Sequence, residues 1–213
     1  AALREELKAK VKNPFARHET WADGAPSGHM LNRFTDAVID NIRLTLGQIP
    51  PKDFDRACAM VADRTKRIHV VGGRITHTLA EYLFLHLQVI RPDVTHIQST
   101  SNAWPHYLLD VFVIFDMRRY ENNTLKLAEM ARDKGAKIVL ITDQWRSPVH
   151  RMADICFSGR IVVPSAWDSA VTTMLLVETM IAAVQDLNWG ETKDRMERLE
   201  QMFDQTMLFR KFT

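Results

Sequence analysis

The segment His69-Val70-Val71-Gly72-Gly73-Arg74-Ile75-Thr76-His77-Thr78-Leu79-Ala80 decides the fold, because it predicts a buried strand that turns directly into a helix. Its two glycines allow a tight turn and let a ligand approach the backbone. A junction of this kind directs free backbone N–H groups and the positive end of a helix at one point. We therefore predict an anion site at Gly72, Gly73, Arg74 and Thr76. A tight turn that binds nothing is the alternative.

Strands and helices alternate along the chain from this junction onward. Strands are predicted at 67–72, 93–98, 111–117, 137–142 and 154–158, and helices between them at 74–90, 121–134 and 147–153. A loop or short helix is expected around 104–109. Residues 111–115 are continuously apolar, as in a strand that is covered on both faces. The alternation predicts a parallel sheet with helices on both faces, so that all strand C-termini lie at one edge.

Further helices are predicted on both sides of this alternating region. An amphipathic helix at 29–46 and a second helix at 51–65 precede it, and helices at 165–188 and 191–211 follow it. The helix at 165–188 is apolar almost all round its middle. Such a helix lies either in the centre of a domain or in a subunit interface.

Composition narrows the class of protein. The chain has 213 residues, 46% of them hydrophobic, and Lys+Arg 28 against Asp+Glu 26 gives a net charge of +2. This balance argues against a protein that binds nucleic acid through a concentrated basic face. The two cysteines, Cys58 and Cys156, lack metal-ligand spacing, and we expect both to be reduced and buried in a cytosolic protein. We expect no metal ion, no cofactor and no membrane span.

Polar residues follow the other strands at the edge where ligands bind in open parallel sheets. Beyond the first junction, the predicted ligand-binding residues are Gln98, Ser99, Ser101, Asp116, Arg118, Arg119 and Thr142. Arginine binds anions in a bidentate manner and small polar groups bind hydroxyls, so the set suits a phosphorylated or carboxylated polyol. The alternative is that one of the adjacent arginines pairs with Asp116 or Glu121.

The order and spacing of these segments resemble the sugar isomerase (SIS) domain, in particular the effector domain of RpiR/MurR-family transcription regulators. The resemblance runs from about Met30 to the C-terminus and is carried by the first junction, by 110–120 (DVFVIFDMRRY), by 124–143, by Ser147-Pro148 and by 165–169 (SAWDS). It implies a three-layer α/β/α sandwich with a five-stranded parallel sheet of the flavodoxin type and extra N- and C-terminal helices.

The chain departs from the SIS pattern at the two junctions that hold phosphate in such domains. The pattern is G-x-G-x-S at the first junction, where this chain has Arg74 for the second Gly and Thr76 for the Ser. It is S-x-S-G-x-T after the third strand, where Asp116, Arg118, Arg119 and Glu121 stand here. The hydroxyl cradle is largely absent, and a carboxylate beside a dianion repels it unless an arginine offsets the charge.

The resemblance implies a sensor that binds a carbohydrate derivative and works as a homodimer or homotetramer. Regulators of this family carry a helix-turn-helix domain, for which this chain has no room. We therefore expect 1–27 to be a linker remnant and 28–213 to be the SIS domain, with DNA contacted only through the missing module. A stand-alone SIS protein, a ketose–aldose isomerase and a purely structural dimerisation module are the alternatives. For the isomerase, the candidate acid–base groups are His77, Glu81, His106, Asp116 and Glu121.

Overall fold

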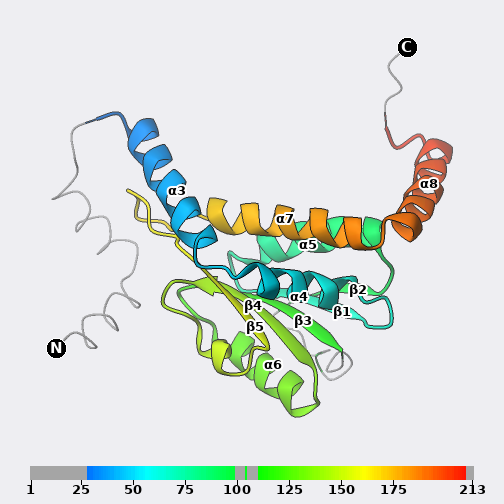
Figure 1. The fold of residues 1–213 in the computed structure, drawn as a ribbon, viewed down its shortest axis with the longest axis horizontal. Helices are drawn as coiled ribbons and strands as arrows, with labels where there is room; N and C mark the ends of the chain where they lie inside the picture. Colours follow the sequence, from blue (N-terminus) through cyan, green and yellow to red (C-terminus); the bar gives the residue numbers. More distant parts are fainter. Residues whose placement is uncertain (1–27, 99–103, 105–109, 210–213) are drawn as a thin grey trace.

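A single parallel sheet forms the centre of the molecule (Figure 1). The computed structural model describes residues 28–98, 104 and 110–209. Within them the strands are β1 (Ile68–Gly72), β2 (Val94–Gln98), β3 (Val111–Asp116), β4 (Lys137–Asp143) and β5 (Ile155–Gly159). They lie in the order β2-β1-β3-β4-β5 with parallel pairing throughout. This is the flavodoxin-type order, and it confirms the predicted fold class.

Helices cover both faces of the sheet, as predicted. The described helices are α3 (Met30–Leu46), α4 (Pro51–Ala62), α5 (His77–Ile90), α6 (Asn122–Asp133), the 3-10 helix η2 (Pro148–Arg151), α7 (Val171–Leu187) and α8 (Trp189–Gln205). Helices α4, α5 and α7 pack on one face, while α6 and η2 pack on the other (Figure 1). None of the helices in the described ranges is long and apolar enough to cross a membrane.

The apolar run in β3 shows why the sheet is buried on both sides. Val113 and Phe115 pack against the α4, α5 and α7 layer, whereas Phe112 and Ile114 pack against the α6 layer. All four side chains are fully buried. Because successive side chains of a strand point to opposite faces, only a strand that is apolar at every position can be covered twice.

The ends of two helices are each stabilised by a single residue. Gly135 follows α6 with φ +83°, a left-handed conformation that favours glycine at this position after a helix. Arg91 follows α5 and is 1% exposed; its guanidinium donates to the carbonyls of Val61, Asp63 and Lys66. These carbonyls lie at and just beyond the end of α4, where a helix leaves its acceptors without internal partners.

Several predicted boundaries differ from the structure. Helix α5 begins at His77, because residues 74–76 form a turn after the glycines. Helix α7 begins at Val171, because hydrogen bonds such as Ser169 N to Ile161 O (2.9 Å) hold the preceding segment in another conformation. The helix at 147–153 is the short η2. The expected segments at 1–27 and 105–109 lie outside the described residues.

The two cysteines are free thiols, but only Cys58 is fully buried as predicted. Burial raises the pKa of the Cys58 thiol to about 12. Cys156 is half-buried, which corrects the prediction. It lies on β5, which is an edge strand of the sheet and is therefore covered less completely.

The close approach of β1 to α5 leads to a stability prediction. A Cβ at Gly72 would lie 2.5 Å from the Thr76 carbonyl oxygen and 2.6 Å from His77 Cα. Because both contacts are with backbone, we expect Gly72→Ala to lower the free energy of unfolding by about 3 kcal/mol. Urea denaturation measures this change.

The matched control is Gly190→Ala in α8, where no described atom lies within 4 Å of the added Cβ. Alanine favours a helix by up to about 1 kcal/mol relative to glycine, so this variant should be as stable as the wild type or slightly more stable. Equal stability of the Gly72→Ala variant and the wild type would contradict the prediction.

Candidate functional site

The first junction is closed by its own side chains and backbone. The backbone N–H of Gly73 donates to Thr76 Oγ1 at 2.8 Å, and the Thr76 hydroxyl donates to the Phe115 carbonyl at 3.0 Å. The start of α5 is thereby fixed to the end of β3. Thr76 thus serves the fold at the position where the sequence predicted a ligand contact.

A carboxylate of the chain accepts a hydrogen bond from the backbone N–H group that was predicted to bind an anion. Arg74 N donates to Glu121 Oε1 at 2.5 Å, across 47 residues of sequence. The same oxygen lies 2.8 Å from the place where a Cβ on Gly73 would stand, so the carboxylate rests directly against the glycine backbone. The Arg74 side chain is exposed. The junction therefore binds an anionic group, and in this structure that group is Glu121.

The end of β3 places a second carboxylate beneath the junction. Asp116 is 2% exposed and accepts hydrogen bonds from the Ser147 hydroxyl and from Glu121 N (3.4 Å). The Thr142 hydroxyl donates to the Asp116 carbonyl at 2.7 Å. Burial raises the pKa of Asp116 to about 6; the charges of Glu121 and Asp143 act in the same direction, whereas the hydrogen bonds oppose the rise.

A third carboxylate, Asp143 at the end of β4, fixes the loop between β3 and α6. Asp143 is fully buried and accepts hydrogen bonds from Arg118 N (2.7 Å), Tyr120 OH (2.7 Å) and Trp145 N (2.9 Å). Burial, together with the charge of Asp143, raises the pKa of Tyr120, which keeps its hydroxyl as a donor. A buried carboxylate must be satisfied by donors of this kind.

The side chain of Arg118 is engaged within the protein. Its Nε and Nη2 atoms donate to the two carboxylate oxygens of Asp168 at 3.0 and 2.6 Å. The guanidinium also lies 4.0 Å from the centre of the Trp145 ring, and the side chain is only 7% exposed. Asp168, rather than Asp116 or Glu121, is therefore the acidic partner of this arginine. Arg119 is exposed at the surface of the same loop.

The structure brings most of the predicted site residues to one edge of the sheet. Those linked in the network described above are Gly73, Arg74, Thr76, Asp116, Arg118 and Thr142. Gly72 ends β1 beside Gln98, the last residue of β2. The predicted contacts Ser99 and Ser101 lie outside the described residues.

The sequence prediction did not assign ligand-site roles to Asp143, Ser147 or Asp168, and it did not foresee that Glu121 occupies the first junction. Asp143 follows an apolar strand and was visible as a strand-end residue. Ser147 precedes Pro148, a pattern typical of a helix start, and its hydroxyl accepts from Val149 N at 3.2 Å. Asp168 lies 50 residues from Arg118, and no local pattern indicates their pairing.

The acid–base candidates differ in access to a ligand. Asp116 lies beneath the junction, while His77 and Glu81 are exposed on α5. His77 Nδ1 lies 2.9 Å from the Arg74 carbonyl oxygen. His106 lies outside the described residues. Within 28–98, 104 and 110–209, no group of three His, Cys, Asp or Glu side chains is placed to hold a metal ion.

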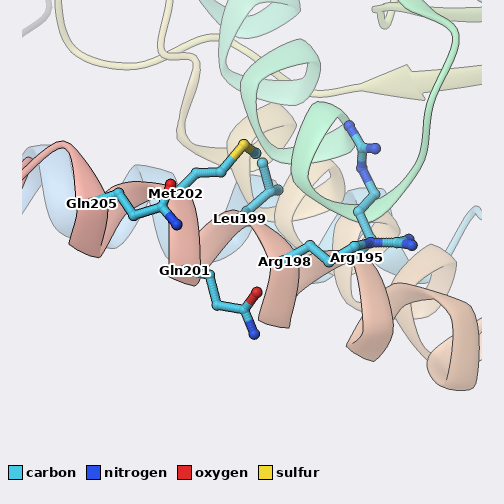
Figure 2. Close-up of a pocket in the computed structure, with 6 residues that line it drawn as sticks. All are labelled: Arg195, Arg198, Leu199, Gln201, Met202 and Gln205. Atoms are coloured by element: carbon cyan, nitrogen blue, oxygen red, sulfur yellow. The ribbon is translucent and has the colours of Figure 1, made fainter.

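A groove of about 380 Å³ lies along α8, away from the strand ends (Figure 2). It is lined by side chains of that one helix: Arg195, Arg198, Leu199, Gln201, Met202 and Gln205. Arg195 donates to the Gln88 carbonyl near the C-terminal end of α5. The strand-end site lies near the start of α7, where Asp168 contacts Arg118, whereas α8 follows the end of α7. The groove is therefore separate from the candidate site.

Asp116 gives the stability of the protein a specific pH dependence. Its pKa is about 6 in the folded state against an ordinary value of 3.8, so the folded state retains a proton that the unfolded chain has released. Protonated Asp116 stabilises the folded state. This contribution is complete below pH 4 and is lost as the pH rises through 6. Asparagine cannot ionise. From pH 4 to pH 7, the stability of Asp116→Asn relative to wild type should rise by about 2 kcal/mol.

Urea denaturation of both proteins across this pH range measures the effect. Asp133→Asn, which changes an exposed residue at the end of α6, is the control and should show no such trend. A constant difference between Asp116→Asn and wild type over the whole range would contradict the assignment of a raised pKa.

Comparison with solved structures places this arrangement among known folds. The RpiR transcription factor from Sphaerobacter thermophilus (sugar isomerase domain) is similar with a TM-score of 0.73 at 20% identity, covering 80% of this chain and 97% of that one. The Vibrio vulnificus NanR protein, complexed with ManNAc-6P, has a TM-score of 0.72 at 15% identity, with 91% and 75% covered. A phosphoheptose isomerase from Francisella tularensis has a TM-score of 0.59 at 17% identity, with 73% and 96% covered.

These similarities establish the fold, and both regulators and isomerases share it. No curated protein sequence matches the chain. A sequence model of the SIS domain family, however, matches residues 63–183, from the end of α4 through most of α7. With the parallel sheet and the strand-end junctions in place, this match shows that the chain belongs to the SIS domain family.

Proposed function

We propose that this SIS domain is the ligand-sensing and dimerisation domain of an RpiR-type transcription regulator. It binds a sugar phosphate or a related carbohydrate derivative at the carboxyl ends of the strands. The ligand controls DNA binding by a helix-turn-helix module outside this chain. Two of the similar folds belong to proteins named RpiR and NanR, and the NanR protein is complexed with ManNAc-6P.

The observation that carries the proposal is the engagement of the carboxylates at the strand ends. Asp116 accepts from Ser147, Glu121 accepts from Arg74 N, and Asp143 accepts from the loop after β3. Each carboxylate holds the fold. A ketose–aldose isomerase needs an acid–base group within reach of the substrate proton. Because the buried Asp116 and Asp143 are committed to the fold in this way, the arrangement favours a binding domain over an isomerase, which is the alternative function.

The site is connected to the helices that surround it, as a sensor requires. The Arg118–Asp168 pair joins the loop after β3 to the segment just before α7. Helix α7 in turn packs against α3, the first described helix of the chain. A ligand that binds two arrangements of this network with different affinity would shift the position of α3. Residues 1–27 precede that helix and would lead to the DNA-binding module.

The exposed apolar residues of α3 provide a surface for a second copy of the chain. They are Met30, Leu31, Ile39, Leu44 and Leu46, each 40–67% exposed. Helix α8 leaves the opposite end of α7 (Figure 1) and carries the exposed Met202. Several large apolar side chains exposed on one helix are typical of a protein interface. We infer that these two helices contact the partner in a homodimer or homotetramer.

Ligand binding is tested by thermal denaturation with a panel of sugar phosphates, sugar acids and amino sugars. At least one compound should raise the Tm, and the rise should grow with the concentration of free ligand. Arg119→Ala removes an exposed guanidinium at the strand ends and should weaken this binding by roughly tenfold. The matched control is Arg198→Ala, which removes an exposed arginine on α8 and should leave ligand binding unchanged.

The same panel separates sensor from enzyme. A coupled isomerisation assay on each compound that binds should show no turnover. Turnover would support the isomerase, while a panel without any stabilising compound would contradict carbohydrate sensing.

Self-association is tested with Leu31→Glu, which places a charge at the most exposed of the α3 apolar residues. Light scattering over a concentration series should show an oligomer for the wild type and a dissociation constant raised roughly tenfold or more for the variant. Met130→Glu on α6, an exposed apolar residue of the other layer, is the control. A monomeric wild type, or equal effects of both variants, would contradict the assigned interface.

A further inference from the structure

We propose that Glu121 determines the ligand specificity of this site: its carboxylate takes the place of a ligand phosphate, so the site selects carbohydrate derivatives without a phosphate group. The ligand class is then a neutral polyol or an amino sugar. This inference rests on the proposed function, in which a carbohydrate derivative binds at the strand ends.

The side chain of Glu121 leaves its own helix to reach the first junction. Glu121 is the N-cap residue of α6, yet within the described structure its carboxylate does not cap α6. Its Oε1 instead accepts from Arg74 N at 2.5 Å. An acidic side chain at an N-cap would normally bind the N–H groups of the helix that it begins. The carboxylate therefore lies on the first junction and not on the start of α6.

The carboxylate also fills the space that an incoming anion would need. The position of a Cβ on Gly73 lies 2.8 Å from Glu121 Oε1 and 3.0 Å from Cδ. A glycine at this point lets an anionic group rest against the backbone. Glu121 already rests there. A phosphate could bind the Arg74 N–H only after the Glu121 side chain had moved away.

The charges around the junction oppose a phosphate even then. Asp116 lies directly below, accepting from Glu121 N, and the fully buried Asp143 lies beside it. The buried guanidinium of Arg118, in the loop after β3, is already paired with both carboxylate oxygens of Asp168. A dianion on the Arg74 N–H would therefore meet these like charges at short range, and the exposed guanidinium groups of Arg74 and Arg119 offset them less because solvent screens them.

The same carboxylates suit a ligand that donates hydrogen bonds. An ionised carboxylate only accepts, and its two oxygens can accept several bonds. The hydroxyls of a polyol or the ammonium of an amino sugar supply such donors, and a charged donor strengthens the bond. Glu121 can therefore hold the Arg74 N–H and bind a ligand donor at the same time.

The experiment compares N-acetylmannosamine with its 6-phosphate, using wild type, Glu121→Thr and Glu121→Gln. Threonine is the residue that the S-x-S-G-x-T pattern has at this position. Glutamine keeps the size and removes the charge. The affinity for the 6-phosphate, measured by calorimetry, should increase roughly tenfold or more in Glu121→Thr and should also increase in Glu121→Gln.

The control is Glu129→Gln, the same change on the exposed side of α6, which should leave phosphate affinity unchanged. If neither Glu121 variant binds the 6-phosphate more tightly than wild type, the proposal is overturned. It is also overturned if the wild type binds the 6-phosphate more tightly than the free sugar. If no carbohydrate binds the wild type, the proposed function is contradicted. An increase in the affinity of Glu121→Thr for the 6-phosphate would still support the role of Glu121.

Discussion

The burial of Asp143 is the constraint on which the sheet edge depends. A carboxylate that is fully removed from water is stable only when donors replace its hydration. The chain meets this requirement with Arg118 N and Tyr120 OH from the loop after β3 and with Trp145 N from the turn after β4. These hydrogen bonds hold the loop after β3 against the end of β4. They help to set where Arg118 and Glu121 lie.

From this loop, acidic side chains connect the successive strand ends. Glu121 accepts a hydrogen bond from the backbone of the β1–α5 junction. Asp116 accepts one from the Ser147 hydroxyl at the start of η2, and Asp168, just before α7, pairs with Arg118. In the SIS pattern, hydroxyl-bearing residues stand at the positions of Asp116 and Glu121. Replacing them with carboxylates makes the edge self-supporting. The edge is then held together by hydrogen bonds within the protein.

The fold could be predicted from the sequence because its signals are local. The continuously apolar β3, the glycines after β1 and Gly135 after α6 each indicate one element or its end, and the strand order followed from the resemblance to SIS domains. For the site, the sequence predicts which residues gather but not how they pair. Which residues gather at the edge follows from the direction of parallel strands. Which of them pair, such as Arg118 with Asp168 or Arg74 N with Glu121, depends on contacts across 50 and 47 residues that no local pattern encodes.

The pairing of Arg118 also sets the conditions under which the site could act as a sensor. A hydrogen bond to a charged group contributes about 1.5–3 kcal/mol, so the bidentate contact with Asp168 resists small perturbations. A ligand changes the arrangement only by the difference between its affinities for the two states. A ligand that leaves Arg118 on Asp168 therefore stabilises the present position of α7. In the proposed sensor, a ligand that competes for the guanidinium would release the segment before α7, which packs on α3. In the proposed sensor, the direction of the response thus depends on whether the ligand carries an acceptor for Arg118 or only donors for Glu121.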